Sequence, residues 1–543
     1  MNLWRLFDGV ARAVPARECV VWRGRRLTYA QVHDRACRLA NVFAAAGLGA
    51  RRPRAGLEPW ESGQDLVGCY LLNGPEYLEA TLAGYAARVA PFNVNHRYVA
   101  DELAYLLDDA AAGAVVYHER FTPVLAEALA RLGRRPLLVR VADGSGHAPL
   151  DGGLDYEDAI AGASPVPPDL AHDPDDLYVL YTGGTTGMPK GTLWRQDDIW
   201  EAALAAGTFP EGATVADVVP AAAGKDPPPS FLPNAPFMHG AAHWLALRAV
   251  LTGERVVINS VVDRLDPDDV WSLVERERVT SMLLVGEAFA RPLLDRFEAS
   301  PVDVSSLRLF VVGGAVTSPA TKARILRAVP HALVLDAAGS SETGSALAQV
   351  ATAGTRVEGG VFSALPSVAV LDEARSRLLR PGEDAIGWFA KSGRIPLGYL
   401  GDPERTARSF PVVDGRRWSV PGDRARWRPD GTVELLGRDA ATINTGGEKV
   451  FAEEVEAALL DHPDVRDVVV VGRPSERWGE EVVAVVALRP GAVVTDDVLR
   501  AAVGARLARY KVPKAFVRVD EVRRGPAGKV DYRWARARAG DPR

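Results

Sequence analysis

Short apolar runs alternate with amphipathic segments along most of the chain. Residues 27–48 carry apolar side chains at helical spacing, and residues 65–74 have the pattern of a strand that enters a turn. Further strands are predicted within AGAVVYHERF, RPLLVRVADG, ERVVINSVV, TSMLLVGEAF and LRLFVVGGAV, with a helix over residues 267–278. Strands that alternate with helical patterns favour mainly parallel sheets. We therefore expect an α/β fold.

The alternation is interrupted at three places. Residues 51–65 are polar and contain Pro and Gly, which predicts a surface loop. Residues 219–233 hold five prolines and are expected to be irregular. Beyond Gly437 the order becomes strand, polar turn, helix, two strands and helix, which predicts an α+β domain of about a hundred residues. We place the domain boundary at 438–440, between domains 1–437 and 441–543.

Composition narrows the class of protein. A chain of 543 residues is too long for one hydrophobic core. Its 64 basic and 70 acidic residues give a net charge of −6, so nothing suggests a nucleic-acid partner. The three cysteines, Cys19, Cys37 and Cys69, lack metal-ligand spacing and fit a reducing compartment. Because no secretory signal and no apolar run of transmembrane length is present, we expect a cytoplasmic protein without an integral membrane segment.

The stretch YTGGTTGMPKG, residues 181–191, follows an apolar strand and is rich in Gly and Thr. A Walker phosphate loop is excluded, because Pro189 precedes Lys190 and Gly191 follows it. Glycines still expose backbone N–H donors, and threonine hydroxyls add further donors, so a phosphate cradle remains open. A tight surface turn explains the stretch equally well when it is taken alone.

The same stretch resembles the phosphate loop of the adenylate-forming superfamily, which comprises acyl-CoA synthetases, amino-acid-adenylating domains and luciferases. That loop has the form [ST]-[SG]-G-T-T-G-x-P-K-G, and residues 182–191 fit it at each position. The resemblance implies a large N-terminal domain of two α/β subdomains plus a distorted β-barrel, hinged to a small α+β domain. It assigns phosphate binding to Thr182, Gly183, Gly184, Thr185, Thr186, Gly187 and Lys190, with Thr186 also catalytic.

Other motifs of the superfamily follow in the same order, although each alone also fits an ordinary turn or a solvated charge. LRLFVVGGAV resembles the adenine-flanking strand and turn, and AAGSSETG resembles the motif whose glutamate holds Mg²⁺ on ATP. A carboxylate oxygen suits Mg²⁺, which keeps few protein ligands beside substrate phosphates. The resemblance therefore assigns adenine to Gly313, Gly314 and Ala315, and metal binding to Glu342 beside Ser341.

The C-terminal part carries the remaining motifs. In the superfamily an aspartate binds the ribose hydroxyls and an arginine lies at the domain junction, which implicates Asp423 and Arg438. The lysine needed for adenylation matches Lys529 in RGPAGKVDYRW. INTGGEKVFAEEVE matches the segment that faces the active site during thioester formation. The resemblance places Gly446, Gly447 and Lys449 there.

His239 in APFMHGAAHW corresponds to a residue near the carboxylate of the acid, so we assign it to substrate positioning among the catalytic residues. His243 is interpreted as a packing residue. Two departures from the superfamily pattern are present: Ala440 stands at the hinge in place of Asp or Lys, and Ala338 stands where many relatives have an aromatic residue.

The resemblance implies an AMP-forming ligase that uses ATP, Mg²⁺ and coenzyme A on a small carboxylic acid, with a homodimer as an option. GGTTGMPKG, WRQDD, GSSETG and NTGGEKVF resemble CoA ligases for steroid side chains and other bulky acids. A steroid or terpenoid acid is therefore expected, the latter including acids of antibiotic biosynthesis, and a fatty acid remains an alternative. Transfer of the acyl group to a carrier protein or an amine is a second alternative. A degenerate nucleotide-binding protein would lack Lys529, Glu342 or Asp423, and all three are present.

Overall fold

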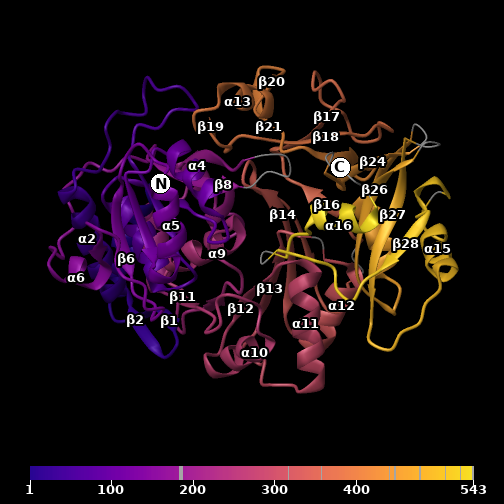
Figure 1. Ribbon diagram of the computed structural model, residues 1–543, viewed down its shortest axis with the longest axis horizontal. Helices are drawn as coiled ribbons and strands as arrows, with labels where there is room; N and C mark the ends of the chain where they lie inside the picture. The colour runs from indigo at the N-terminus through magenta and orange to yellow at the C-terminus, as the bar shows by residue number, and fades with distance from the viewer. Residues whose placement is uncertain are drawn as a thin grey trace.

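The computed structural model describes residues 1–182, 188–315, 317–355, 358–438, 441–445, 448–475, 479–507, 509–525 and 528–540. Its strands form three sheets of 15, eight and five strands. Figure 1 shows the N-terminal part of the chain on the left and a smaller yellow C-terminal unit on the right. The predicted α/β fold, with a large N-terminal and a small C-terminal domain, is confirmed.

The eight-stranded sheet has the order β19-β9-β8-β4-β3-β5-β6-β7. From β8 through β4, β3, β5 and β6 to β7 the strands are parallel, whereas β9 pairs antiparallel with both β8 and β19. Its strands are β3 (Leu66–Tyr70), β4 (Ala90–Asn93), β5 (Ala114–His118), β6 (Leu137–Val141), β7 (Leu154–Asp155), β8 (Leu177–Thr182), β9 (Lys190–Arg195) and β19 (Gly398–Tyr399). The helices of this part of the chain are α2 (Tyr29–Ala45), α3 (Pro75–Ala86), α4 (Ala100–Asp109), η1 (Glu119–Phe121), α5 (Thr122–Leu129) and α6 (Tyr156–Ala161).

The 15-stranded sheet is parallel from β1 through β11, β10, β12 and β13 to β14, and antiparallel beyond β14. Its first strands are β1 (Glu18–Trp22), β2 (Arg25–Thr28), β10 (Ser230–Leu232), β11 (Arg255–Val257), β12 (Ser281–Leu284), β13 (Leu309–Gly313), β14 (Leu333–Ser340) and β15 (Gly344–Ala351). The others are β16 (Val361–Ala364), β17 (Val368–Leu371), β18 (Gly387–Ser392), β20 (Val412–Val413), β21 (Arg416–Ser419), β22 (Asp423–Trp427) and β23 (Thr432–Arg438). A distorted β-barrel was expected in the large domain; in the described residues the strands beyond β14 pair as a continuation of this sheet.

The helices associated with the large sheet include α10, which lies where a helix was predicted over residues 267–278. They are α1 (Leu3–Ala13), α7 (Gln196–Ile199), η2 (Trp200–Leu204), α8 (Val215–Ala223), α9 (Gly240–Leu251), α10 (Pro267–Arg276), α11 (Gly286–Ala299), α12 (Pro319–Ala328) and α13 (Pro403–Ser409). The prediction that residues 219–233 are irregular was wrong in part. Helix α8 contains Pro220 and β10 begins at Ser230, because burial of Val218 and Phe231 outweighs the local proline signal.

The C-terminal unit is a five-stranded sheet with helices on both faces. Its elements are β24 (Thr442–Thr445), β25 (Glu448–Phe451), α14 (Ala452–Leu460), β26 (Val465–Ser475), β27 (Gly479–Leu488), α15 (Asp496–Gly504), η4 (Arg509–Lys511), β28 (Ala515–Arg518) and α16 (Tyr532–Ala539). Alternate valines of β26 enter two cores: Val468 and Val470 pack with α14 and α15, and Val469 and Val471 pack with α16. This burial of both faces explains the unbroken valine run.

All three cysteines are free thiols buried in the larger part of the molecule. Burial raises the pKa of Cys19, and it raises the pKa values of Cys37 and Cys69 to about 12. Among the helices of the described residues, none has both the length and the apolar character that crossing a bilayer requires.

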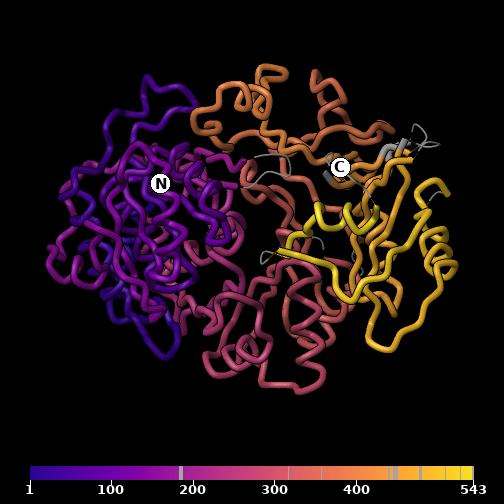
Figure 2. The backbone as a smooth tube through the Cα atoms, viewed as in Figure 1, coloured from indigo at the N-terminus to yellow at the C-terminus, as the bar shows by residue number. Residues whose placement is uncertain are grey.

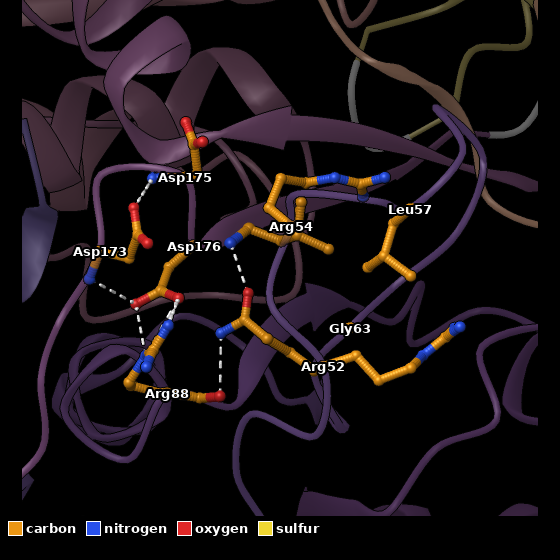
Figure 3. Close-up of a pocket in the computed structure, with 10 residues that line it drawn as sticks. Arg52, Arg54, Leu57, Gly63, Arg88, Asp173, Asp175 and Asp176 are labelled. Carbon is orange, nitrogen blue, oxygen red and sulfur yellow. Dashed lines mark hydrogen bonds and ion pairs between the residues drawn. The ribbon is translucent and has the colours of Figure 1, made fainter.

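The loop at residues 51–65 is joined to the start of β8 by a charged junction, which Figure 3 shows. Gln64 Nε2 donates to Arg88 O over 2.8 Å, and Leu177 N donates to Gln64 Oε1 over 2.6 Å. Arg88 binds the carboxylate of Asp176 through Nη2 at 2.7 Å and Nε at 3.0 Å, and Asp176 is buried. The cavity at this junction measures about 20 Å³, room for about one water molecule, so it is structural rather than a substrate pocket.

We expect Asp176→Asn to lower the free energy of unfolding of this part of the molecule by about 3 kcal/mol, because the substitution leaves the Arg88 guanidinium partly buried without its counter-charge. Urea denaturation followed by fluorescence would measure the change. The matched control is Asp175→Asn, since the Asp175 side chain is 42% exposed and lies 3.6 Å from Arg195. Equal effects of the two substitutions on the free energy of unfolding would contradict a stabilising role of the Asp176–Arg88 ion pair.

Candidate active site

The phosphate loop joins two paired strands. β8 and β9 pair in register through Tyr181 with Gly191 and through Thr182 with Lys190, so the loop closes a hairpin. We call β8, β9 and their connection the phosphate hairpin. Residues 183–187, which include five predicted phosphate ligands, lie outside the described residues. Thr182 and Lys190 therefore mark the two ends of the loop.

Lys190 is held by an acidic residue that the motifs did not identify. Its Nζ lies 3.0 Å from Oδ1 of Asp109, the last residue of α4. Tyr181 Oη donates to Asp109 Oδ2 over 2.8 Å, and Tyr105 Oη donates to Oδ1 over 3.2 Å. Burial lowers the pKa of Lys190, but the hydrogen bonds to Tyr105 and Asp109 and the charge of Asp109 outweigh it and raise that pKa. The ammonium is thus kept charged at the base of the loop.

Ser341 and Glu342 lie at the tip of the hairpin between β14 and β15, which we call the acidic tip (residues 341–343). Trp194 of β9 donates its indole N–H to Ser341 O over 2.9 Å. Tyr399 of β19 donates to Glu342 Oε1 over 2.9 Å, and Ser419 Oγ donates to Glu342 O over 2.6 Å. The acidic tip is therefore fixed beside the phosphate hairpin, although the two belong to different sheets.

A buried lysine donates hydrogen bonds to the backbone of the acidic tip and of the residues that follow it. Lys391 Nζ donates to Thr343 O over 2.7 Å and to Ser345 O over 2.9 Å. Burial lowers the pKa of Lys391 to about 8. Its two carbonyl acceptors fix the backbone on the C-terminal side of Glu342.

The end of β13 and the turn after it have little free space. A Cβ atom at Gly313 would lie 2.7 Å from Ala337 O. Gly314 has a φ of +76°, and a Cβ atom there would lie 3.4 Å from Val285 Cγ1. Ala315 follows them at the carboxyl end of the parallel strands, the edge at which α/β proteins bind ligands. Ala338 of β14 pairs with Leu347 of β15 and is partly buried in the neighbouring core.

His239 immediately precedes α9 and carries a buried Nε2 without a hydrogen-bond partner among the described residues. Burial lowers its pKa to about 3, and the charge of Lys529 is the next largest cause, followed by His96 and Arg97. The ring is therefore neutral near pH 7. His243 is structural, as predicted: its Nδ1 lies 3.0 Å from Tyr178 Oη and its ring packs edge-on against Tyr77.

Lys529 closes a tight turn that reaches the large domain. Gly525 N donates to Lys529 O over 2.7 Å, and Gly528 N donates to Gly525 O over 2.9 Å. A Cβ atom at Gly528 would lie 3.1 Å from Val285 O, next to the start of α11. In Figure 2 the yellow chain correspondingly extends from the right-hand unit to the centre of the molecule. The structure thus brings Lys529 toward His239.

The other C-terminal candidates are placed by their strands. Asp423 in β22 is opposite Arg438 in β23, which puts the predicted ribose-binding residue beside the domain junction. Lys449 lies in β25 opposite Asn444. Gly446 and Gly447 fall outside the described residues, as does the predicted hinge residue Ala440.

Sequence reasoning missed several residues that position the site. Asp109, Tyr399, Trp194 and Lys391 act through contacts made over long sequence separations, and of these four only Trp194 stands in a motif used above, WRQDD, where no role was assigned to it. A local signal also existed for Asp109, an acidic residue at the C-terminal end of α4. Helix C-termini favour cations, so a carboxylate there indicates a cationic partner elsewhere.

The chain matches the family model "AMP-binding enzyme" over residues 7–393 and the model "AMP-binding enzyme C-terminal domain" over residues 454–529. It belongs to the AMP-binding enzyme family. The second match ends at Lys529, and the first includes the phosphate hairpin and the acidic tip. The sequence-based assignment to the adenylate-forming superfamily is thereby confirmed.

Relatives of this AMP-binding enzyme are acyl-CoA ligases. It is 50% identical to the medium-chain acyl-CoA ligase Mig of Mycobacterium avium, over 98% of this chain and 96% of the relative. It is 38% identical to 3-oxocholest-4-en-26-oate–CoA ligase of Rhodococcus rhodochrous, over 99% and 96%. The crystal structure of ATP-bound MatB from Rhodopseudomonas palustris superposes with a TM-score of 0.79 at 26% identity, covering 99% of each chain. The expectation of an AMP-forming acid–CoA ligase is confirmed.

We expect Asp109→Asn to shift the alkaline limb of the pH dependence of kcat/KM for ATP to lower pH. Loss of the carboxylate removes an interaction that raises the pKa of Lys190, whereas burial, which lowers that pKa, remains. Lys190 would then lose its proton at a lower pH. Pyrophosphate release measured between roughly pH 7 and 10.5 would detect the shift.

The control is Asp108→Asn, because the Asp108 side chain is 74% exposed and lies 3.9 Å from Arg134. An alkaline limb at the wild-type position in Asp109→Asn would show that Asp109 does not tune Lys190.

Proposed function

We propose that this enzyme forms an acyl-adenylate from a hydrophobic carboxylic acid and ATP, and then transfers the acyl group to coenzyme A. The observation that supports the proposal is that the acidic tip lies beside the phosphate hairpin, while Lys529 of the C-terminal unit lies near His239 of the large domain. A carboxylate oxygen attacks the α-phosphorus of ATP, and pyrophosphate leaves. The CoA thiol then attacks the acyl carbon, and AMP leaves.

The side chains present suit the charge that develops in the first step. Lys529 and Lys190 supply positive charge for phosphoryl oxygens, and Thr186 supplies a hydroxyl donor. The neutral imidazole of His239 can donate or accept one hydrogen bond at its Nε2, which suits positioning of the acid rather than proton transfer from an imidazolium. Asp423 is proposed to bind the ribose hydroxyls, with Arg438 beside it.

Glu342 fits the expected Mg²⁺ ligand. Tyr399 fixes Oε1 of its carboxylate, and Oε2 has no hydrogen-bond partner among the described residues. Mg²⁺ typically takes one or two protein carboxylates together with substrate phosphates and water. When bound, the ion would neutralise phosphate charge. Glu342 would hold the metal, and Tyr399 and Lys391 would keep the carboxylate and its backbone in place.

We further propose that residues 1–437 and 441–543 act as two domains around a hinge at 438–440. In this scheme the orientation seen here presents Lys529 for adenylation. A rotation about the hinge would replace it with Gly446, Gly447 and Lys449 for thioester formation. Ala440 can absorb a backbone rotation, since hinge residues need not be polar.

The acid is proposed to be a medium-chain fatty acid, with a steroid side-chain acid as the second candidate. The 50% identical relative named for medium-chain acids supports the first, and the 38% identical relative named for 3-oxocholest-4-en-26-oate supports the second. The sequence resemblance had favoured a bulky acid. The buried free thiols accord with a reducing compartment, and we propose a cytoplasmic location on that ground.

A panel of acids would test the proposal directly. We expect pyrophosphate release with ATP and decanoic acid, and acyl-CoA with AMP after CoA is added, whereas 3-oxocholest-4-en-26-oic acid and a terpenoid acid should react more slowly. A faster reaction with the steroid acid would reverse the order of the two candidates. Acyl-AMP that persists in the presence of CoA would contradict the ligase assignment and favour transfer to a carrier protein or an amine.

Lys529→Ala should abolish acyl-AMP formation and largely spare thioester formation from supplied acyl-AMP, because the lysine contacts phosphoryl oxygens only in the first step. Single-turnover assays of the two half-reactions would separate them. Lys514→Ala, which changes an exposed lysine of the same domain, is the control. Equal loss of both half-reactions would refute this division of roles.

A further inference from the structure

The Lys529 turn is attached to β26 by a bidentate ion pair. Arg524 binds Asp467 through Nη2 to Oδ1 at 2.7 Å and through Nε to Oδ2 at 2.9 Å. Its remaining Nη1 donates to Gly528 O over 3.0 Å, one residue before the lysine. Both side chains are less than one-fifth exposed, which makes the pair rigid compared with a surface salt bridge.

A second arginine joins the same strand to the large domain. Arg291 of α11 donates from Nη1 to Val465 O over 3.1 Å and also to Arg466 O. These carbonyls belong to the start of β26, immediately before Asp467. One side chain of the large domain therefore contacts the backbone beside the residue that binds Arg524.

The position of Arg291 is itself fixed by a buried carboxylate. Arg291 Nε donates to Glu287 Oε2, one turn earlier on α11. Glu287 also accepts from Ser318 N over 2.7 Å and from Thr321 Oγ1 over 2.8 Å at the start of α12. Glu287 and Arg291 are 5% and 8% exposed. The guanidinium is thus held by α11 and α12 and directed at the small domain.

The two attachments lie on the same part of α11. A Cβ atom at Gly528 would lie 3.1 Å from Val285 O and 3.4 Å from Ala288 Cβ, and Arg291 lies one turn further along the helix. A continuous set of contacts therefore runs from Glu287 through Arg291, the start of β26, Asp467 and Arg524 to the backbone of the Lys529 turn.

We propose that Arg291 and Arg524 are positioning residues that hold Lys529 at the site of adenylation. This inference rests on the proposed function. Arg291 fixes β26 against α11, and Arg524 transmits that position to the turn. Because Val465 O and Arg466 O belong to the small domain, a rotation of that domain removes the acceptors of Arg291. The Arg291 contacts thus support the first half-reaction and are absent during the second, whereas the contacts of Arg524 with Asp467 and Gly528 move with the small domain.

The test measures both half-reactions in Arg291→Leu, Arg524→Leu and the conservative variant Arg524→Lys. The acid is decanoic acid, or 3-oxocholest-4-en-26-oic acid if the wild-type enzyme prefers it, and the matching synthetic acyl-AMP starts the second step. We expect both leucine variants to lose about 100-fold in acyl-AMP formation, the effect of a misplacement of about 1 Å. Thioester formation should stay at the wild-type rate, and Arg524→Lys should recover part of the first step.

The matched controls are Arg296→Leu on α11 and Arg523→Leu beside Arg524, both more exposed than the residues under test. They should leave both steps unchanged. Thioester formation also reports folding, since a misfolded variant would lose both steps. Should a leucine variant misfold, Arg291→Lys replaces Arg291→Leu, and it should lose the first step selectively because one ammonium cannot serve Glu287 and two carbonyls at once.

Equal losses in both steps, or an unchanged first step in the Arg291 and Arg524 variants, would overturn the inference while leaving the ligase activity of the wild-type enzyme intact. Failure of the wild-type enzyme to adenylate any acid of the panel would instead overturn the proposed function, and this inference with it.

Discussion

The hydrogen bonds from β9 and β19 to the acidic tip are the constraint on which the active site depends. The phosphate hairpin belongs to the eight-stranded sheet and Glu342 to the 15-stranded sheet, and each sheet has its own strand order. Trp194 and Tyr399 connect the two by direct donation to Ser341 and Glu342. Without these bonds, the strand pairing within one sheet would not fix the position of the other sheet. With them, the strands of the phosphate hairpin and the carboxylate of Glu342 occupy a fixed relative position.

Electrostatics at the site follows from burial as much as from charge. Lys190 retains its proton because it is hydrogen-bonded to the carboxylate of Asp109, which Tyr105 and Tyr181 hold in place by hydrogen bonds. His239, which is buried close to Lys529, has its pKa lowered to about 3. The site therefore combines fixed cations with a neutral imidazole, an arrangement that suits binding of anions without protonating the acid that must attack.

Much of the fold could be predicted from local pattern, because apolar runs and amphipathic segments record which face of an element is buried. Helix α2 and strands β3, β5, β12 and β13 lie where the pattern placed them. Residues 219–233 did not follow the local signal, since α8 tolerates Pro220 when its apolar face is buried. The motif residues were found by order and spacing. Asp109, Tyr399 and Arg291 were not, because their roles depend on partners that are distant in sequence.

The buried cysteines have a chemical consequence for an enzyme of this class. An acyl-adenylate reacts readily with thiolates, and any exposed thiolate on the enzyme would compete with the intended acceptor. Cys37 and Cys69, with pKa values raised to about 12, and Cys19, whose pKa is also raised by burial, stay protonated and out of contact with solvent. Packing of the core thereby keeps the protein's own thiols from competing with an external thiol for the acyl group.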